Sequence, residues 1–510
     1  MCYINSNNAK LQRNELKSKK REDMMKKIKN ILFISVICFT LIIIGSAFFI
    51  VLAQQQDSSG ISIEGIWEGK LKVPGIELRI VCKISKSPDG TLTATLDSPD
   101  QGVTGIPVEK VIVKDNDLYM EINSLGGIFE GKISSDFLTI EGQWKQSGQI
   151  LPLTVKRVNK VVEVFRPQEP KKPYPYIEEE VVYENKEAEI TLTGTLTLPS
   201  GKGSFPSVLL ITGSGPQDRN EAIAGHRPFL VLADYLTRQG VAVLRVDDRG
   251  VGGSTGDFSQ ATSEDFASDV LAGIGYLKTR KEINPEQIGL IGHSEGGLIA
   301  PMVAVKSPDV AFIVLMAGTG LTGEEILYLQ GALISRAMGV SEEDITKNRQ
   351  FNKKIFSLIR EEKDEKIIEE KLRQMFMADW AELNEEEKKA IGDPEVYLKA
   401  QLQSLLSPWL KFFLTYDPKP TLSKVKCPVL ALNGEKDLQV PPKENLSAIE
   451  DALKTGGNQN YTIKELQGLN HLFQTAQTGV PSEYAKIEET ISPVALKIIG
   501  DWILEQTRDK

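Results

Sequence analysis

The feature that most constrains the fold is an apolar run that ends in a glycine-flanked serine, Ile288–Gly297 (IGLIGHSEGG). The run reads as a buried β-strand, and the residues that follow it continue as a helix. A G-x-S-x-G pattern in this context is typical of a sharp strand-to-helix turn that lifts the serine, here Ser294, above the sheet. Side chains at Gly292 and Gly296 would collide in such a turn. The alternative is an ordinary glycine-rich turn in which the serine has no chemical role.

Buried strands alternate with helices on both sides of this turn. Strands are expected at 189–198, 206–212, 241–246, 310–316, 428–433 and 461–466, and helices near 228–238, 263–277 and 491–506. This alternation predicts an α/β fold with a doubly wound, mostly parallel sheet. Residues 181–321 and 421–510 would form that core. Residues 322–420 are rich in charge and helix formers, and an insertion of this size would form a helical lid over the site.

Residues 54–160 follow a period of two instead. Short alternating segments are separated by turn signals such as Pro88–Gly90. About seven or eight strands of this kind predict a small all-β barrel or sandwich. Trp67 and Trp144 are expected in its packing rather than in a ligand platform. A proline-rich stretch, Arg166–Pro175, predicts an extended linker, which we place at 161–180.

The first 53 residues read as a targeting or anchoring segment. A basic leader, 1–30, precedes an uncharged and mostly apolar run, 31–53, which as a helix would span about 35 Å against a hydrocarbon core of about 30 Å. Lysines before the run, and none directly after it, predict that the body lies outside the cytoplasm. The length favours a retained transmembrane helix, whereas a small-residue pattern favours a signal peptide cleaved near Ala53. The chain could also begin at Met24 or Met25.

Composition excludes some classes of partner. The formal net charge is −9, and basic residues are concentrated in the leader, so the body is acidic and nucleic acid is not an expected partner. The four cysteines form neither a C-x-x-C pair nor a metal-ligand cluster. No metal site and no disulfide framework are therefore expected.

A reactive serine needs a base, and the chain holds only three histidines. His293 adjoins Ser294, and strand alternation turns its side chain away from the serine. His226 comes too early in the chain for the order expected on such a sheet. His471 follows the last strand, where a base can hang over the sheet edge, and it is the predicted general base.

The base in turn needs a carboxylate to fix its tautomer. Asp437 lies just past the strand before His471 and is the predicted partner, with Glu435 as the competitor. The order Ser294, Asp437, His471 is the one expected on α/β-hydrolase folds.

The tetrahedral intermediate needs two N–H donors. One is expected from Glu295, directly after the nucleophile, and the other from Ser214 or Gly215 in the loop after strand 206–212. That loop could also be a glycine turn without a role. Three aromatic residues at the end of the insertion could line an acyl pocket or form the insertion's own core; they are Trp409, Phe412 and Phe413.

The sequence resembles the bacterial two-domain carboxylesterases of the α/β-hydrolase superfamily. The matching segments are Asp97–Gln101, Gly213–Arg219, Asp247–Ser254, Gly292–Gly296, Ser407–Trp409, Tyr416–Pro418 and Gly434–Asp437. The resemblance covers nearly everything from about 60 to 510, but not the leader or the apolar run. It implies a β-rich domain ahead of a catalytic domain. It also implies hydrolysis of short- to medium-chain carboxylic esters by a Ser-His-Asp triad without a cofactor.

We therefore expect a serine carboxylesterase that takes small-molecule esters and is either membrane-anchored through 31–53 or secreted. Two alternatives stay open. One is a serine peptidase on the same fold, although the sequence has no conspicuous cluster for a peptide terminus. The other is a non-catalytic envelope protein that binds ligands through the β-rich domain.

Overall fold

The computed structural model describes residues 63–508, apart from 74–75, 88, 100–102, 147–148, 161–164, 384–387 and 389–393. The predicted leader (1–30) and the predicted transmembrane helix or signal peptide (31–53) lie outside the described residues. Among the helices that the structure describes, none combines the length and apolar character that a bilayer span requires.

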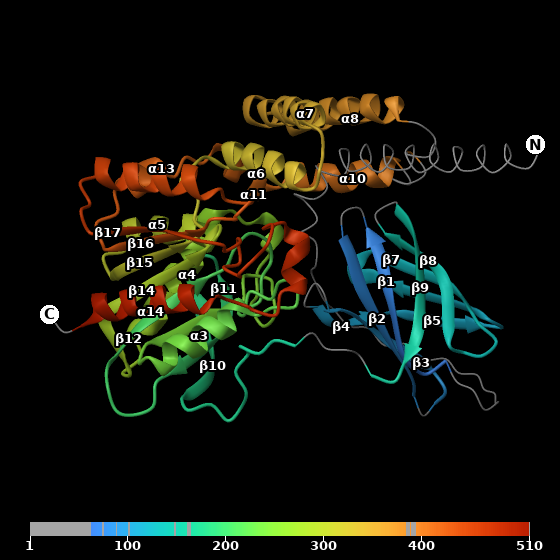
Figure 1. Cartoon of the computed structure of the whole chain (residues 1–510), viewed down its shortest axis with the longest axis horizontal. Helices are drawn as coiled ribbons and strands as arrows, with labels where there is room; N and C mark the ends of the chain where they lie inside the picture. The colour runs from blue at the N-terminus through green and yellow to red at the C-terminus, as the bar shows by residue number, and fades with distance from the viewer. Residues whose placement is uncertain are drawn as a thin grey trace, which may run out of the picture.

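The first described part of the chain forms a nine-stranded antiparallel sheet. Its strands are β1 (Gly65–Val73), β2 (Ile76–Lys86), β3 (Leu92–Ser98), β4 (Val103–Val108), β5 (Lys110–Lys114), β6 (Asp117–Ile122), β7 (Gly127–Ile133), β8 (Thr139–Gln146) and β9 (Gln149–Val158). They pair in the order β4-β3-β2-β1-β9-β8-β7-β6-β5. Contacts of β3 with β5 and of β4 with β6 bring the two ends of the sheet together, so the sheet curls around its own core (Figure 1).

The period of two in the sequence explains this core. In β6, Leu118, Met120 and Ile122 are buried while the residues between them are more exposed, which is the pattern of a strand with one face inside. Trp67 and Trp144 are almost fully buried in the same cluster, so the prediction that they serve packing is confirmed.

The rest of the chain is built on an eight-stranded sheet in the order β10-β11-β13-β12-β14-β15-β16-β17. The strands are β10 (Ile177–Asn185), β11 (Ile190–Leu198), β12 (Phe205–Ile211), β13 (Ala242–Val246), β14 (Ile283–His293), β15 (Val310–Met316), β16 (Val429–Gly434) and β17 (Tyr461–Leu466). β10 pairs antiparallel with β11, and β11 pairs antiparallel with β13. From β13 through β12 to β17, all neighbouring strands pair in parallel. The mostly parallel, doubly wound sheet is the predicted one.

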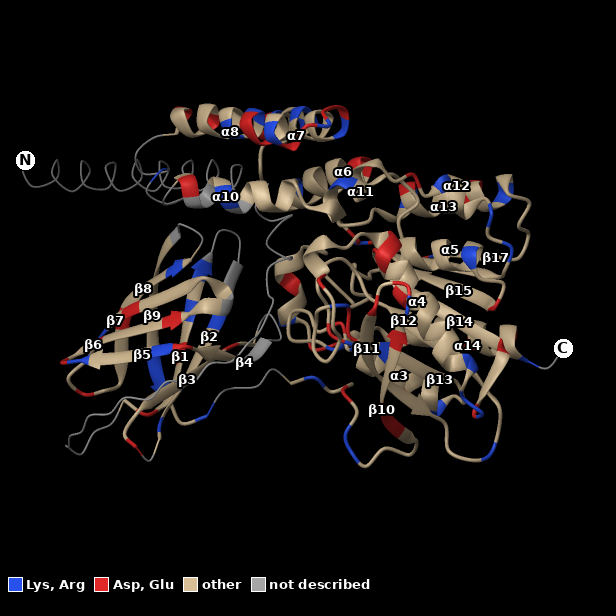
Figure 2. Cartoon of the chain, turned by 180° about the vertical axis from the view of Figure 1, so that it is seen from behind, with Lys and Arg blue, Asp and Glu red and all other residues tan. Residues whose placement is uncertain are grey.

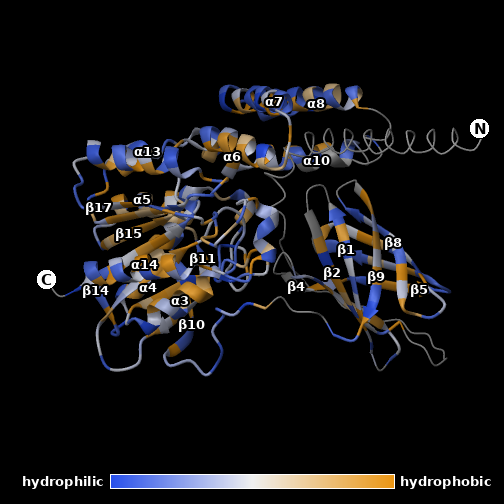
Figure 3. Ribbon diagram, in the orientation of Figure 1, coloured by the Kyte–Doolittle hydropathy of each residue, from blue (hydrophilic) through white to orange (hydrophobic). Residues whose placement is uncertain are grey.

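Helices cover both faces of this sheet. α4 (Ser263–Lys278), α5 (Gly296–Lys306) and α13 (Pro442–Thr455) pack on one face, and α3 (Pro228–Arg238) and α14 (Pro493–Thr507) pack on the other. The central strands β12, β13, β15 and β16 are mostly apolar and buried (Figure 3). The strand order reverses direction between β12 and β14, and ligands of open α/β sheets bind at the carboxyl ends of the strands at such a point.

The segment between β15 and β16 is helical, as predicted. It contains α6 (Gly323–Ala337), α7 (Glu342–Glu361), α8 (Glu365–Glu382), α10 (Pro394–Leu405), α11 (Pro408–Thr415) and α12 (Lys419–Leu422). α7 and α8 lie farthest from the sheet, and their charged residues are mostly exposed (Figure 2). α6 and α11 lie between them and the sheet (Figure 1). The insertion has an apolar core of its own, to which α6, α7, α8, α10 and α11 contribute.

Two linker side chains attach the linker to the part of the chain that is built on the eight-stranded sheet. The guanidinium of Arg166 donates to the carbonyl oxygens of Ala224, Gly225, Ala485 and Ile487. The side chain of Gln168 bonds the backbone of 490–491 in both directions, donating to one carbonyl and accepting two N–H groups. The proline-rich segment is therefore fixed on loops that lie beside the predicted site.

Candidate active site

Ser294 sits on the turn between β14 and α5 with a φ of 54°, in the left-handed region that non-glycine residues rarely adopt. The glycines around it are required by close backbone approach. A Cβ on Gly292 would lie 2.0 Å from the carbonyl oxygen of Gly296, and a Cβ on Gly296 would lie 2.2 Å from that of Ile211. The strand, turn and helix are those of a nucleophile elbow.

His471 and Asp437 are brought together by the pairing of β16 with β17, because each follows one of these parallel strands. Nδ1 of His471 lies 2.7 Å from Oδ2 of Asp437, and both residues are buried. The other oxygen of Asp437 accepts the N–H groups of Gln439 and Val440 at 2.8 and 2.9 Å. The carboxylate is thus held in one orientation by its own loop.

Glu435, the competitor in the sequence, has another partner. Its Oε2 accepts the backbone N–H of Gly468 at 2.8 Å. The structure therefore gives Asp437, and not Glu435, the position beside His471.

His226 is buried in a purely structural setting. Its Nδ1 lies 3.0 Å from the hydroxyl of Thr490, and its Nε2 lies 3.0 Å from the carbonyl oxygen of Tyr484. Burial, together with the nearby charge of Arg166, lowers the pKa of His226 to about 4. This histidine is neutral in the folded protein at neutral pH.

This lowered pKa predicts an acid-dependent loss of stability. Between about pH 6.5 and pH 4 the unfolded chain binds a proton at His226 and the folded chain does not, so the free energy of unfolding falls as pH falls. The loss from this group alone is expected to reach about 3 kcal/mol. Urea unfolding across this pH range should show that the free energy of unfolding falls less steeply with decreasing pH in His226→Gln than in the wild type. Equal slopes would contradict the assignment.

The loop after β12 approaches the nucleophile closely. A Cβ on Gly213 would lie 3.3 Å from the Cβ of Ser294. The N–H of Gly213 donates to Oε1 of Glu221 at 2.7 Å and is therefore committed. Ser214 and Gly215, the predicted donors to an oxyanion, come next in the loop, and Gly215 has a φ of 94°. Glu295, the other predicted donor, directly follows Ser294 at the start of α5.

Two aspartates at the end of β13 hold this loop in place. Oδ1 of Asp248 accepts the hydroxyl of Thr212 at 2.8 Å, and Oδ2 accepts the N–H of Gln217 at 2.9 Å. Asp247 accepts the N–H and the guanidinium of Arg219. Burial raises the pKa of Asp248 well above its ordinary value. The segments 213–219 and 247–254 of the sequence are thus bonded to each other, and the second holds the first in place.

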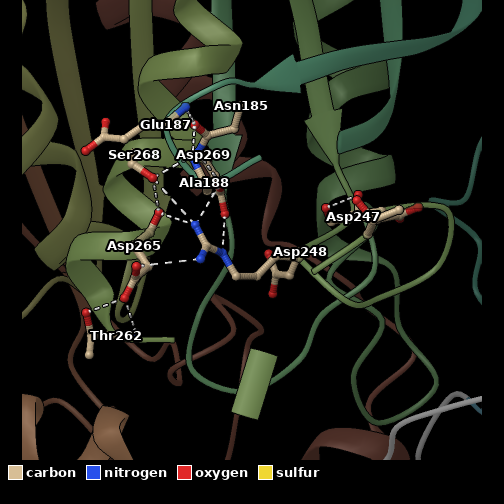
Figure 4. Close-up of polar contacts among 12 residues, drawn as sticks. Asn185, Glu187, Ala188, Asp247, Asp248, Thr262, Asp265, Ser268 and Asp269 are labelled. Carbon is tan, nitrogen blue, oxygen red and sulfur yellow. Dashed lines mark hydrogen bonds and ion pairs between the residues drawn. The ribbon is translucent and has the colours of Figure 1, made fainter. Parts of the chain in front are cut away.

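Arg249 extends these contacts toward α4. Its guanidinium binds the carboxylate of Asp269 through Nε at 2.7 Å and Nη2 at 2.9 Å, and Nη2 also donates to the carbonyl oxygen of Asp265 (Figure 4). Asn185 donates to the same Asp269 carboxylate at 2.7 Å. The turn that carries the two aspartates is therefore fixed to β10 and α4.

The side chain of Glu295 makes contacts that the sequence did not predict. It is buried, and its Oε1 accepts the hydroxyl of Ser263 at 2.6 Å and the indole N–H of Trp409 at 2.8 Å. Burial raises the pKa of Glu295, although hydrogen bonds from Ser263, Trp409 and Ser214 oppose that shift. One carboxyl group thus joins the elbow, the loop after β12, α4 and the helical insertion.

The three aromatic residues predicted for an acyl pocket lie in two places. Trp409 and Phe413 stack at 5.0 Å within the apolar core of the insertion, and Trp409 also reaches Glu295. Phe412 stacks on Tyr416 and packs against the core of the sheet. A small cavity of about 40 Å³ lies beneath the loop after β12, and these three residues do not line it. Their role in substrate binding stays a prediction.

Glu221 is a second residue that sequence reasoning missed. It contacts both Gly213 and His293, although it lies in a loop without a recognisable motif. The run Gly213–Arg219 pointed to the loop after β12, but no residue spacing pointed to a carboxylate beyond it.

Comparisons with known proteins identify the family of the chain. The family model for X-Pro dipeptidyl-peptidases (S15 family) matches residues 159–464, more than half of the chain. Esterase EstD of Thermotoga maritima is 26% identical over 348 residues, which cover 66% of this chain and 73% of that protein.

Solved structures that match this chain include the α/β hydrolase GrgF from Penicillium sp. sh18, with 17% identity, a TM-score of 0.40 and coverage of 65% of this chain and 100% of that chain. Est1E from Butyrivibrio proteoclasticus with bound ferulic acid has 16% identity, a TM-score of 0.37 and coverage of 64% and 100%. Likenesses of this size say nothing about activity. With the elbow, the His471–Asp437 pair and the family match together, the chain belongs to the X-Pro dipeptidyl-peptidase (S15) family.

Proposed function

We propose that this protein is a serine carboxylesterase that hydrolyses short- to medium-chain esters through an acyl-enzyme. The observations that support it most are the bonded His471–Asp437 pair and a serine held on a left-handed turn. His293, the residue before that serine, lies 3.0 Å from the backbone carbonyl of His471, which supports their joining in one site. The similarity to an esterase of Thermotoga maritima points the same way.

In the proposed mechanism, Ser294 attacks the carbonyl carbon of the ester while Nε2 of His471 takes the hydroxyl proton. Asp437 keeps the Nδ1 proton of His471 in place and stabilises the imidazolium that forms. The N–H groups of Glu295 and of Ser214 or Gly215 receive the oxyanion, and each such donor lowers the barrier by about 3–4 kcal/mol. The imidazolium then protonates the leaving alkoxide, which departs as the alcohol.

Deacylation repeats these steps with water. His471 takes a proton from the water, which attacks the acyl carbon, and the collapse of the second tetrahedral intermediate releases the acid and restores the Ser294 hydroxyl. No cofactor takes part in the proposed cycle.

The buried carboxylates favour an ester over the N-terminus of a peptide. Removal of an N-terminal dipeptide requires recognition of the α-amino group, for which a carboxylate is the natural partner. Glu295 is already bonded to Ser263 and Trp409, and Glu221 is bonded to Gly213 and His293. Both side chains are also buried, including Oε2 of Glu221, which has no hydrogen-bond partner among the described residues. We therefore infer that neither carboxylate receives the ammonium group of a peptide.

A paired substrate panel tests this choice. The p-nitrophenyl esters of acetate, butyrate, octanoate and dodecanoate should be hydrolysed, with the highest kcat/KM among the shorter acyl groups, and Ala-Pro-p-nitroanilide should not. Faster cleavage of the anilide would establish a peptidase. The absence of turnover on every substrate would favour the non-catalytic alternative.

We further propose that the helical insertion 322–420 acts as a lid that is fastened by Trp409. The indole N–H reaches a carboxyl group on the residue next to the nucleophile. Lid helices over an active site exclude water and shape the acyl pocket.

Trp409→Phe should release this fastening while keeping the stacking on Phe413. Loss of one buried hydrogen bond is expected to lower the free energy of unfolding by about 1–3 kcal/mol and to raise KM more than it lowers kcat. Trp380→Phe, in α8 of the same insertion, is the matched control and should change KM by less than about two-fold. Equal KM values for Trp409→Phe and the wild type would contradict the lid role.

The cellular location is proposed from the sequence alone. A basic leader followed by the apolar run 31–53 supports an extracytoplasmic enzyme that is either anchored or cleaved near Ala53. N-terminal sequencing of the cell-associated and secreted fractions distinguishes these forms, and a cytoplasmic fraction with an intact N-terminus would refute both.

A further inference from the structure

A second buried histidine–carboxylate pair lies beside the predicted triad. His293 directly precedes Ser294, and its Nδ1 lies 2.9 Å from Oε1 of Glu221. Its Nε2 lies 3.0 Å from the backbone carbonyl oxygen of His471. The His293 and His471 rings are 4.8 Å apart, centre to centre. His293 and Glu221 are 5% and 2% exposed, so bulk solvent screens the pair only weakly.

The partners of His293 determine its protons. A carbonyl oxygen and an ionised carboxylate both accept hydrogen bonds and have no hydrogen to donate. His293 therefore makes both bonds only when both of its ring nitrogens carry hydrogen. Burial alone would lower the pKa of His293, but the charge of Glu221 and the hydrogen bonds to Glu221 and to the His471 carbonyl raise it above its ordinary value.

Glu221 also holds the loop that carries the predicted oxyanion donors. The same Oε1 that faces His293 accepts the N–H of Gly213 at 2.7 Å. The backbone of Glu221 has a φ of 51°, which costs on the order of 1–3 kcal/mol and persists only where the surroundings impose it. Arg166 fixes the same loop a few residues later, at Ala224 and Gly225. The position of this carboxylate is therefore determined from both sides.

We propose that Glu221 and protonated His293 form a positioning ion pair that sets the relative placement of the loop after β12, the nucleophile elbow and the loop of the general base. The pair holds the loop after β12 through the N–H of Gly213. It holds the nucleophile elbow because His293 directly precedes Ser294, and it holds the loop of the general base through the carbonyl of His471. Neither residue touches the reacting atoms. The inference rests on the proposed acyl-transfer function, but the protonation of His293 is measurable without any turnover.

The charged and titratable groups facing His293 are few. Glu221 faces it from the loop after β12, and His471 and Asp437 face it from the loops after β17 and β16, while Phe473 contributes an apolar edge. Glu221→Gln removes the largest influence that favours the cation and leaves burial to oppose it. A neutral His293 has one N–H. While the glutamine oxygen stays on the Gly213 N–H, this histidine must give up either its bond to that oxygen or its bond to the His471 carbonyl.

The first experiment is nitrogen NMR of the full-length protein labelled with ¹⁵N-histidine. Only three histidines contribute signals, and the spectra of His226→Gln and His293→Gln assign them. At roughly pH 7.5, where a free imidazole is mostly neutral, wild-type His293 should show two protonated nitrogens. One protonated nitrogen in wild-type His293 would overturn the proposal, whether or not the protein hydrolyses esters.

The second experiment is kinetic. Glu221→Gln keeps an oxygen for the Gly213 N–H, and it should lower kcat on p-nitrophenyl butyrate by about 10- to 100-fold with little change in KM. The alkaline limb of its pH–activity profile should also move to lower pH by about one pH unit or more, because His293 loses its proton more readily without the charge of Glu221. Glu221→Ala loses the Gly213 contact as well and should fall further.

The matched control is Glu483→Gln, because Glu483 likewise accepts backbone N–H groups of its own loop, from Gln477, Thr478 and Gly479. It should leave kcat within about two-fold of the wild type at a similar cost in Tm. If Glu221→Gln keeps the wild-type kcat and pH profile, or if Glu483→Gln loses as much activity, the positioning role is wrong.

Discussion

Replacing Ser294 with alanine should lower kcat on p-nitrophenyl esters by at least about four orders of magnitude. The substitution removes the only atom that the proposed mechanism makes covalent, and no other side chain can replace it. The elbow itself should survive, because its geometry is imposed by the close backbone approach at Gly292 and Gly296 rather than by the serine hydroxyl. Steady-state kinetics with an active-site titration of the wild type measures the loss.

Thermal unfolding is the control for this variant. The Tm of Ser294→Ala should stay within a few degrees of the wild-type value, since alanine meets the same left-handed backbone demand as serine. A variant that keeps its Tm and also keeps more than a tenth of the wild-type rate would rule out Ser294 as the nucleophile.

Replacing Asp437 with asparagine should lower kcat by about four orders of magnitude. The amide oxygen can still accept the N–H groups of Gln439 and Val440, which leaves the NH₂ group facing Nδ1 of His471. The neutral imidazole must then carry its N–H hydrogen on Nε2, and a protonated Nε2 cannot accept the proton of Ser294. The backbone stays in place while the base is in the wrong tautomer.

Glu435→Gln is the matched control for the aspartate. Glu435 lies two positions earlier in the same loop and accepts the N–H of Gly468, a contact that a glutamine oxygen can keep. Its kcat should stay within about two-fold of the wild type. Comparable losses in both variants would mean that the loop, and not the carboxylate of Asp437, carries the effect.

The sequence predicts those parts of the molecule whose causes are local. The strand, turn and helix around Ser294 follow from short-range periodicity and from glycines that a sharp turn demands. Parallel strands end at one edge of the sheet, so residues just after β16 and β17 could be expected to meet, and Asp437 and His471 do so. With only three histidines in the chain, elimination was also possible.

Contacts between distant segments were not predictable in the same way. Glu221 is 72 positions from His293, and Trp409 is 114 positions from Glu295. No sequence motif or residue spacing predicts either contact. Their partners are set by the packing of a loop and of an inserted helix onto the sheet, which no local pattern records. The insertion's aromatic residues were ambiguous for the same reason.

The β-rich region shows a related limit. β7 (Gly127–Ile133) contains two glycines, and β9 (Gln149–Val158) contains Pro152, which pairs with β8 only, because the register of β9 with β1 runs from Val155 to Val158. Both residue types weaken a strand pattern. The closed arrangement of the sheet, rather than the preference of each segment, holds these strands in place.

The most direct test of the central claim is covalent labelling with a fluorophosphonate, followed by intact-mass and peptide mass spectrometry. The reagent reacts with a serine only when a base and an oxyanion site activate it. The account predicts one adduct per chain, on the peptide that contains Ser294, and no adduct in Ser294→Ala. An unlabelled wild-type protein, or an adduct that persists in Ser294→Ala, would contradict it.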